Sequence, residues 1–134
     1  MRFVNGRQQV LLRDEITTTG SIMWRAHTNA TVTTSGSTAT LSRDGQTLTA
    51  TILNAPSGAQ FTTADAVRLA GDPALPTGQT DQANPGVTVL LIDTPAGTGG
   101  SAVIEILFTP GNSQSSSLTA KSVSLSGWSL TSHN

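Results

Sequence analysis

The side chains that could perform chemistry in this sequence are few and widely spaced. His27 and His133 are the only histidines and there is no cysteine, so no group of residues has the spacing of a metal site. The eight carboxylates are spread along the chain, and the one adjacent pair, Asp14 and Glu15, would point to opposite faces of a strand. The sequence therefore predicts no catalytic residues, no metal ligands and no cofactor.

Two kinds of active site stay open as alternatives, because their residues can be far apart in the sequence. A pair of carboxylates could be assembled across the fold, as in glycoside hydrolases. A Ser–His–Asp site could be assembled in the same way with His27 as the base, although the motif Gly-x-Ser-x-Gly is absent. The glycine-rich stretch at 97–100 precedes a strand-like run, so we expect a turn there and no phosphate site.

Carbohydrate binding is the remaining candidate, because aromatic rings stack on sugar rings and arginine binds carboxylates or sulfates through two parallel hydrogen bonds. Trp24 shares an alternating face with Ile22 and Ala26, so we expect it in the core. Arg25 and His27 lie on the opposite face of that strand. The residues that we predict to contact a ligand are Arg25, His27, Arg43, Arg68 and Trp128. The alternative for the arginines is plain solvation or a structural ion pair.

The elements that must position these residues follow a period of two. Alternating apolar and polar residues predict about nine or ten strands, in an all-β fold with two antiparallel sheets forming a jelly-roll-like β-sandwich. Asp44-Gly45 and the stretch Ser35–Ser37 predict hairpin turns. Val87–Ile92 is apolar except for Thr88, which indicates a central strand. A short strand at Val67–Leu69 and a final strand over Val123–Leu130 are also expected.

Length and composition place the chain in one domain, residues 1–134, with a long surface loop at 71–86 that holds three of the six prolines. Charged residues make up 11% and the net charge is -1, which argues against nucleic acid as a partner. No window of 18 apolar residues exists, so no membrane span is expected. The 22 Thr and 15 Ser residues supply the polar surface instead of charges. The triplet Asn29-Ala30-Thr31 is a potential glycosylation site whose use stays open.

Several of these segments resemble the C-terminal β-sandwich of the heparinase II/III-like polysaccharide lyases, over most of residues 8–130. The resemblance is carried by Leu12–Ile16, Ile22–Thr28, the hairpin Ala39–Leu48, Ile52–Pro56, Leu107–Pro110 and Leu125–Trp128. Asp14, Trp24 and His27 match strands of that family without an assigned catalytic role. We expect a secreted or extracellular protein, although Met1–Arg7 lack the apolar core of a signal peptide. Either the protein is made in the cytosol, or the chain is a mature fragment or an excised domain with an added methionine.

The resemblance also implies a function. In such lyases an α/α toroid and a large β-domain bring together a catalytic Tyr, a His and an Asn or Arg, whereas this chain has no toroid and no Tyr. We therefore expect a non-catalytic module that supports or binds an anionic polysaccharide and packs against the catalytic domains of a parent lyase. The alternative is a free-standing lectin-like protein, with a homodimer as one option, whose shallow sugar site lies near loop 71–86 and Trp128.

Overall fold

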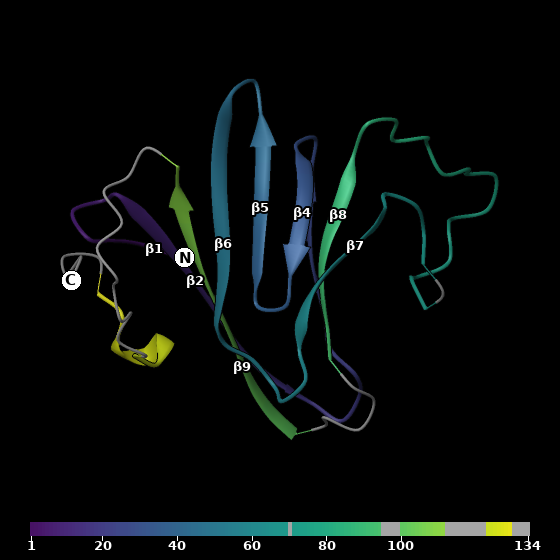
Figure 1. Ribbon diagram of the computed structural model, residues 1–134. Helices are drawn as coiled ribbons and strands as arrows, with labels where there is room; N and C mark the ends of the chain where they lie inside the picture. Colours follow the sequence, from purple (N-terminus) through teal and green to yellow (C-terminus); the bar gives the residue numbers. More distant parts are fainter. Residues whose placement is uncertain (70, 95–99, 112–122, 130–134) are drawn as a thin grey trace.

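The computed structural model describes residues 1–69, 71–94, 100–111 and 123–129, which form nine strands and one short 3-10 helix (Figure 1). The prediction of an all-β fold with two antiparallel sheets is confirmed. No helix in these residues is long and apolar enough to cross a membrane. The elements are β1 (Arg2–Val4), β2 (Gln9–Thr18), β3 (Met23–Thr28), β4 (Thr31–Ser35), β5 (Thr38–Arg43), β6 (Gln46–Asn54), β7 (Gln60–Asp65), β8 (Thr88–Asp93), β9 (Gly100–Pro110) and the helix Leu125–Gly127.

The strands pair in a nested order across two sheets. The larger sheet has the order β1-β2-β9-β6-β5-β4, and the smaller sheet has the order β3-β8-β7. The consecutive strands β2 and β3 lie in different sheets, and they pair with β9 and β8 respectively; β6 and β7 pair with the other sides of the same two strands. This wrapping of strand pairs around one another is the arrangement of a jelly roll, as predicted.

The core lies between the inner faces of the two sheets. Alternating residues of β9 and β8 supply its largest buried side chains, and Ala39 and Ala50 let the sheets approach closely. Trp24 is half-buried and packs against this core, as predicted from its alternation with Ile22 and Ala26. The buried members are Ile22, Ala39, Ala50, Phe61, Leu90, Ile92, Ala102, Ile104 and Ile106.

The central strand of the smaller sheet, β8, is buried on both faces, in agreement with the apolar run at 87–92. Leu90 and Ile92 face the core, whereas Val89 and Leu91 face outward and pack with Ala66 in a second apolar cluster. Residues 71–86 contain no strand or helix, and they follow β7 on the outer side of this sheet (Figure 1). The chain from 66 to 87 therefore shields apolar side chains that a two-layer sandwich would leave in water.

The expected hairpins are confirmed. Asp44 and Gly45, at the tip between β5 and β6, have φ values of 49° and 74°, and this backbone is the one that favours an Asp-Gly pair. Gly36, with φ of 56°, turns the chain between β4 and β5.

Two expected strands are wrong. No strand forms at Val67–Leu69, where Arg68 and Leu69 bond to loop residues instead of to a neighbouring strand. The segment 123–129 contains the 3-10 helix Leu125–Gly127 instead of a strand. The indole N–H of Trp128 bonds to the Val123 carbonyl at 2.9 Å, and the ring packs on the outer face of the larger sheet. His133, Leu130 and the predicted turn at 97–99 lie outside the described residues.

Candidate functional site

A groove on the outer side of the smaller sheet brings together three of the five residues that the sequence singles out. It has a volume of about 710 Å³ and runs between β3 and the segment 66–84. Arg25 and His27 line one wall and Arg68 lines the other. Arg68 comes from a segment some forty residues along the chain, so the fold assembles this site from distant parts.

The alternation of β3 places the first wall. Trp24 and Ala26 point to the core, so Arg25 and His27 point outward, beside Leu91 and Val89 of β8 in the strand register. Both of these β8 side chains are buried under the segment 66–87. The polar side chains of this wall therefore lie next to buried apolar side chains of β8. Burial of these side chains stabilises the position of the loop that covers them.

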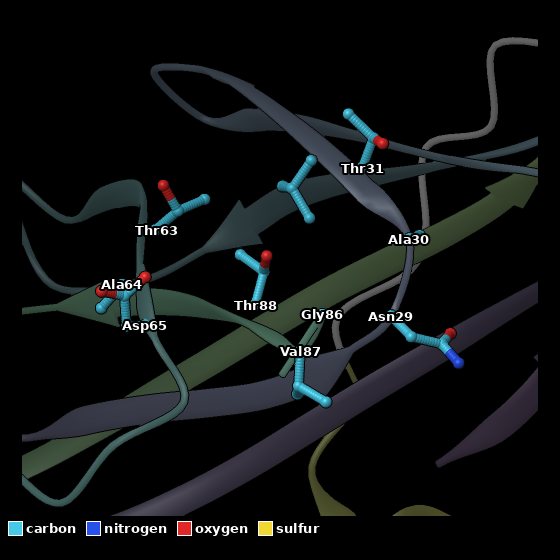
Figure 2. Close-up of a pocket in the computed structure, with 10 residues that line it drawn as sticks. Asn29, Ala30, Thr31, Thr63, Ala64, Asp65, Gly86, Val87 and Thr88 are labelled. Atoms are coloured by element: carbon cyan, nitrogen blue, oxygen red, sulfur yellow. The ribbon is translucent and has the colours of Figure 1, made fainter. Parts of the chain in front are cut away.

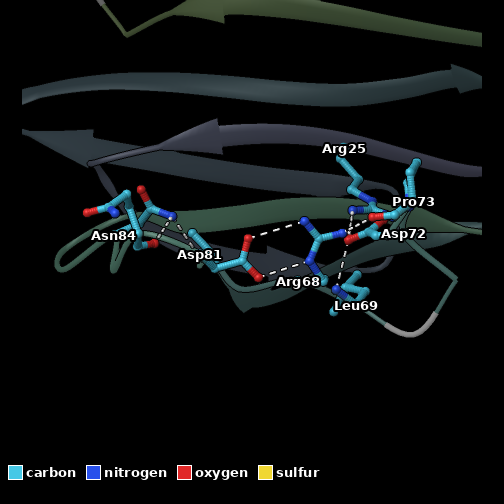
Figure 3. A network of polar contacts seen from close by, with 9 residues as sticks. Arg25, Arg68, Leu69, Asp72, Pro73, Asp81 and Asn84 are labelled. Atoms are coloured by element: carbon cyan, nitrogen blue, oxygen red, sulfur yellow. Dashed lines mark hydrogen bonds and ion pairs between the residues drawn. The ribbon is translucent and has the colours of Figure 1, made fainter. Parts of the chain in front are cut away.

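Arg25 ties the loop to β3 through Asp72 (Figure 3). Its two terminal nitrogens donate to the two carboxylate oxygens of Asp72 at 2.7 and 3.2 Å, and the Leu69 N–H donates to the same carboxylate at 2.8 Å. These hydrogen bonds, Arg25 first, lower the pKa of Asp72 from 3.8 to about 2. Asp72 in turn raises the pKa of Arg25.

Arg68 makes a second bidentate pair within the loop. Its Nε and Nη2 donate to the carboxylate of Asp81 at 2.9 and 3.2 Å, and its Nη1 donates to the Pro73 carbonyl. The side chains are one-third and one-half exposed, so this pair faces the solvent at the groove rim. The amide of Asn84 donates to the carbonyls of Ala66 and Gln82 and closes the loop on itself (Figure 3).

The groove presents two arginine–aspartate pairs to the solvent. The guanidinium charges of Arg25 and Arg68 are matched by the carboxylates of Asp72 and Asp81, which gives paired donors and acceptors with no net charge. Apolar surface lies beside them, because Val67 is 66% exposed and Leu75 is 37% exposed.

The other two predicted residues lie elsewhere. Arg43 is exposed at the tip of the β5–β6 hairpin and pairs with Asp44 at 3.2 Å. Trp128 packs against Val4, Leu11 and Leu107 on the outer face of the larger sheet, and the Arg2 guanidinium lies 5.4 Å from its ring centroid. The structure therefore does not bring Arg43 and Trp128 to the groove or to each other.

The sequence reading missed a second hollow, of about 750 Å³, at the edge of the sandwich (Figure 2). The edge strands β4 and β7 are joined at one end by a bond from the Phe61 N–H to the Gly36 carbonyl at 2.9 Å. Toward their other ends they flank the hollow, which the β3–β4 turn and the start of β8 complete. Its polar lining consists of Asn29, Thr31, Thr63, Asp65 and Thr88. The only signal for this hollow in the sequence is that Thr, Asn and Asp residues cluster at the ends of strands.

A buried ionic cluster on the outer face of the larger sheet was also missed. Arg13 on β2 donates to Glu105 on β9 at 2.6 Å and to Glu15 at 2.8 Å, and both members of the first pair are buried. Glu15 also accepts the Leu125 N–H at 2.9 Å, and these two partners, Leu125 first, lower its pKa. The cluster anchors the C-terminal 3-10 helix, and we assign it a structural role.

In residues 1–69, 71–94, 100–111 and 123–129, no three His, Asp or Glu side chains lie close enough together to hold a metal ion. Comparison with known proteins adds no family: no protein-family model and no curated protein matches the chain. The function must therefore be argued from the groove itself.

Proposed function

We propose that this chain is a non-catalytic β-sandwich module that binds an anionic polysaccharide in the groove between β3 and the segment 66–84. The observation that carries the proposal is the convergence of Arg25, His27 and Arg68 on one groove that also has exposed apolar surface. As the resemblance of the sequence suggests, the module would accompany the catalytic domains of a polysaccharide lyase and would be found outside the cell.

The two arginines have different roles in this proposal. The Asp72 carboxylate is only 20% exposed and is held by both Arg25 and the Leu69 N–H, so this pair tethers the loop. Arg68 is as exposed as Arg25, but its partner Asp81 is 49% exposed, and exposed ion pairs add little to stability, about 0–1 kcal/mol. A uronate or sulfate group of the ligand can therefore replace Asp81 on the guanidinium of Arg68 at little cost, with two parallel hydrogen bonds.

The two carboxylates with shifted pKa values, Asp72 in the groove and Glu15 on the larger sheet, do not suit the role of general acid. A general acid for sugar chemistry needs a raised pKa. The pKa values of Glu15 and Asp72 are both lowered by their hydrogen-bond partners, so these groups stay ionised at neutral pH. They serve as acceptors for Arg side chains and backbone N–H groups.

Affinity electrophoresis of the intact chain tests the proposal, in gels that contain a polyuronate such as alginate, a sulfated glycan such as heparin, or a neutral glucan. We expect retardation by an acidic polysaccharide that weakens as salt is added. Arg68→Gln should weaken it, and Asp81→Asn should strengthen it, because Asp81 competes with the ligand for Arg68. Arg43→Gln is the matched control, since it removes the same charge from an exposed hairpin, and it should change nothing.

Two results would overturn the proposal: no retardation by any acidic polysaccharide, or equal losses in Arg68→Gln and Arg43→Gln. The free-standing dimeric lectin is the second candidate, and one observation favours it. The strand β4 is an edge of the larger sheet and carries no charged side chain, and although its Gly36 end bonds to β7, its other end permits edge pairing between copies. A monomeric mass in solution would exclude the dimer and leave the groove assignment intact.

A further inference from the structure

The outer face of β4, β5 and β6 carries a lattice of hydroxyl groups that neither the groove nor the core uses. Ala39, Leu41 and Ala50 point to the core, so the residues between them point outward. At every one of the nine outward positions on the paired part of these strands the residue is Thr or Ser. We name this set the hydroxyl face, and its members are Thr31, Thr33, Ser35, Thr38, Thr40, Ser42, Thr47, Thr49 and Thr51.

The strand register aligns these hydroxyls in rows that cross the sheet. The central row is Thr33–Thr40–Thr49, and it continues to Thr109, which pairs with Thr49 on β9. The flanking rows are Thr31–Ser42–Thr47 and Ser35–Thr38–Thr51. Hydroxyls therefore repeat about every 4.8 Å across the strands and about every 6.7 Å along them.

The hydroxyl face is uncharged, and among the described residues it is open except at Thr47, whose hydroxyl packs against Gly111. None of its nine residues is buried, and none of their side chains hydrogen-bonds to the described part of the chain. The nearest charges in sequence, Arg43 and Asp44, sit at the hairpin tip and pair with each other. The chain as a whole carries few charges, and a face with hydroxyls alone is suited to an uncharged partner that offers hydroxyls in return.

We infer that the hydroxyl face binds a linear, uncharged polysaccharide, with the chain lying along a row and across the strands. The spacing between strands is close to the length of one sugar residue in an extended β-1,4-linked chain, so successive sugars would meet successive threonines. A single sugar unit would use one or two of these groups, whereas a long chain uses a whole row. The ligand class follows from the proposed polysaccharide function, but the site is separate from the groove.

Two observations favour a polysaccharide chain over a flat crystal surface such as ice. Neighbouring strands are rotated by about 20–25° in a twisted sheet, so a polysaccharide chain can follow the face while a flat plane touches only part of it. The row that begins at Thr31 also leads to the hollow between β4 and β7, since Thr31 lines both. The Asn29 amide and the Asp65 carboxylate of that hollow are sugar-binding groups, and they give the row a polar end (Figure 2).

The test is co-sedimentation of the intact chain with acid-swollen cellulose and with chitin. The variant Thr33→Val/Thr40→Val/Thr49→Val removes the central row of hydroxyls but keeps the shape and β propensity of each side chain. Its control is Thr17→Val, an exposed position on β2 of the same sheet. We expect the wild type and the control to sediment, and the triple variant to bind at least about tenfold more weakly. Equal melting temperatures show that the fold is kept.

The inference is overturned if the triple variant binds these solids as the wild type does, or if the wild type binds neither of them. It is also overturned if the wild type shows thermal hysteresis in freezing solutions that the triple variant loses, because the face would then bind ice. Its failure is distinguishable from failure of the groove, since binding to acidic polysaccharides depends on Arg68 and should be unchanged in the triple variant.

Discussion

The guanidinium of Arg25 and the carboxylate of Asp72, 47 positions apart in the sequence, form a bidentate ion pair at 2.7 and 3.2 Å. This pair joins strand β3 to the loop that covers the smaller sheet. Because the Leu69 N–H binds the same carboxylate, one side chain sets both the position and the local conformation of the loop. The groove has its shape as a result.

Acid should loosen this loop in a defined range. The pKa of Asp72 is lowered from 3.8 to about 2, so the pair contributes fully above about pH 4 and its contribution is lost as pH falls through 2. We expect the amide proton shift of Leu69 to titrate with a midpoint near 2 in NMR spectra. Asp72→Asn should abolish that titration and raise protease cleavage between 66 and 84 at neutral pH. A midpoint near 4 would contradict the pairing.

The buried pair Arg13–Glu105 should be costly to break on one side only. Glu105→Gln leaves the Arg13 charge with less compensation in a buried place, and we expect a loss of about 3 kcal/mol in the free energy of unfolding. The double variant Arg13→Met/Glu105→Leu removes both charges and should recover most of this loss. Urea unfolding measures both. A single variant as stable as the wild type would contradict the buried pair.

Trp24→Ala tests the core assignment of that residue. Trp24 is half-buried against Ile22, Ile92 and their neighbours, so we expect a loss of about 2–4 kcal/mol, below the value for a fully buried Trp. Polysaccharide binding by the folded fraction should be unchanged. If the variant melts like the wild type and loses binding, then Trp24 is part of the ligand site and the core assignment is wrong.

A strand or turn was predictable from the sequence where a single local pattern determines it. Alternation in β3 gave its correct faces, and the apolar run at 87–92 correctly indicated a central strand. Asp44-Gly45 gave a correct hairpin because the positive φ values of its turn favour those residues. The pattern of Val123–Leu130 misled, because Trp128 packs on the outer face of the larger sheet while Leu125 is exposed. Apolar residues at alternating positions therefore do not by themselves show that a segment pairs with a strand.

The site was predictable only in part. The alternation of β3 placed Arg25 and His27 on one outer face, but their meeting with Arg68 depends on how an aperiodic loop folds back. The partners Asp72 and Asp81 carry no local signal that assigns them to arginines. The hydroxyl face needed the register of three strands, because the sequence shows only scattered threonines.

The most direct test of the groove assignment is a titration of the isotope-labelled chain with a short oligouronate, followed by NMR. We expect the largest shift changes at the side-chain Nε–H of Arg68, at His27 and at backbone amides of 66–84. The Arg43 hairpin and the Trp128 indole should stay unchanged. Changes confined to Arg43 or Trp128, or none up to saturating oligouronate, would contradict the account.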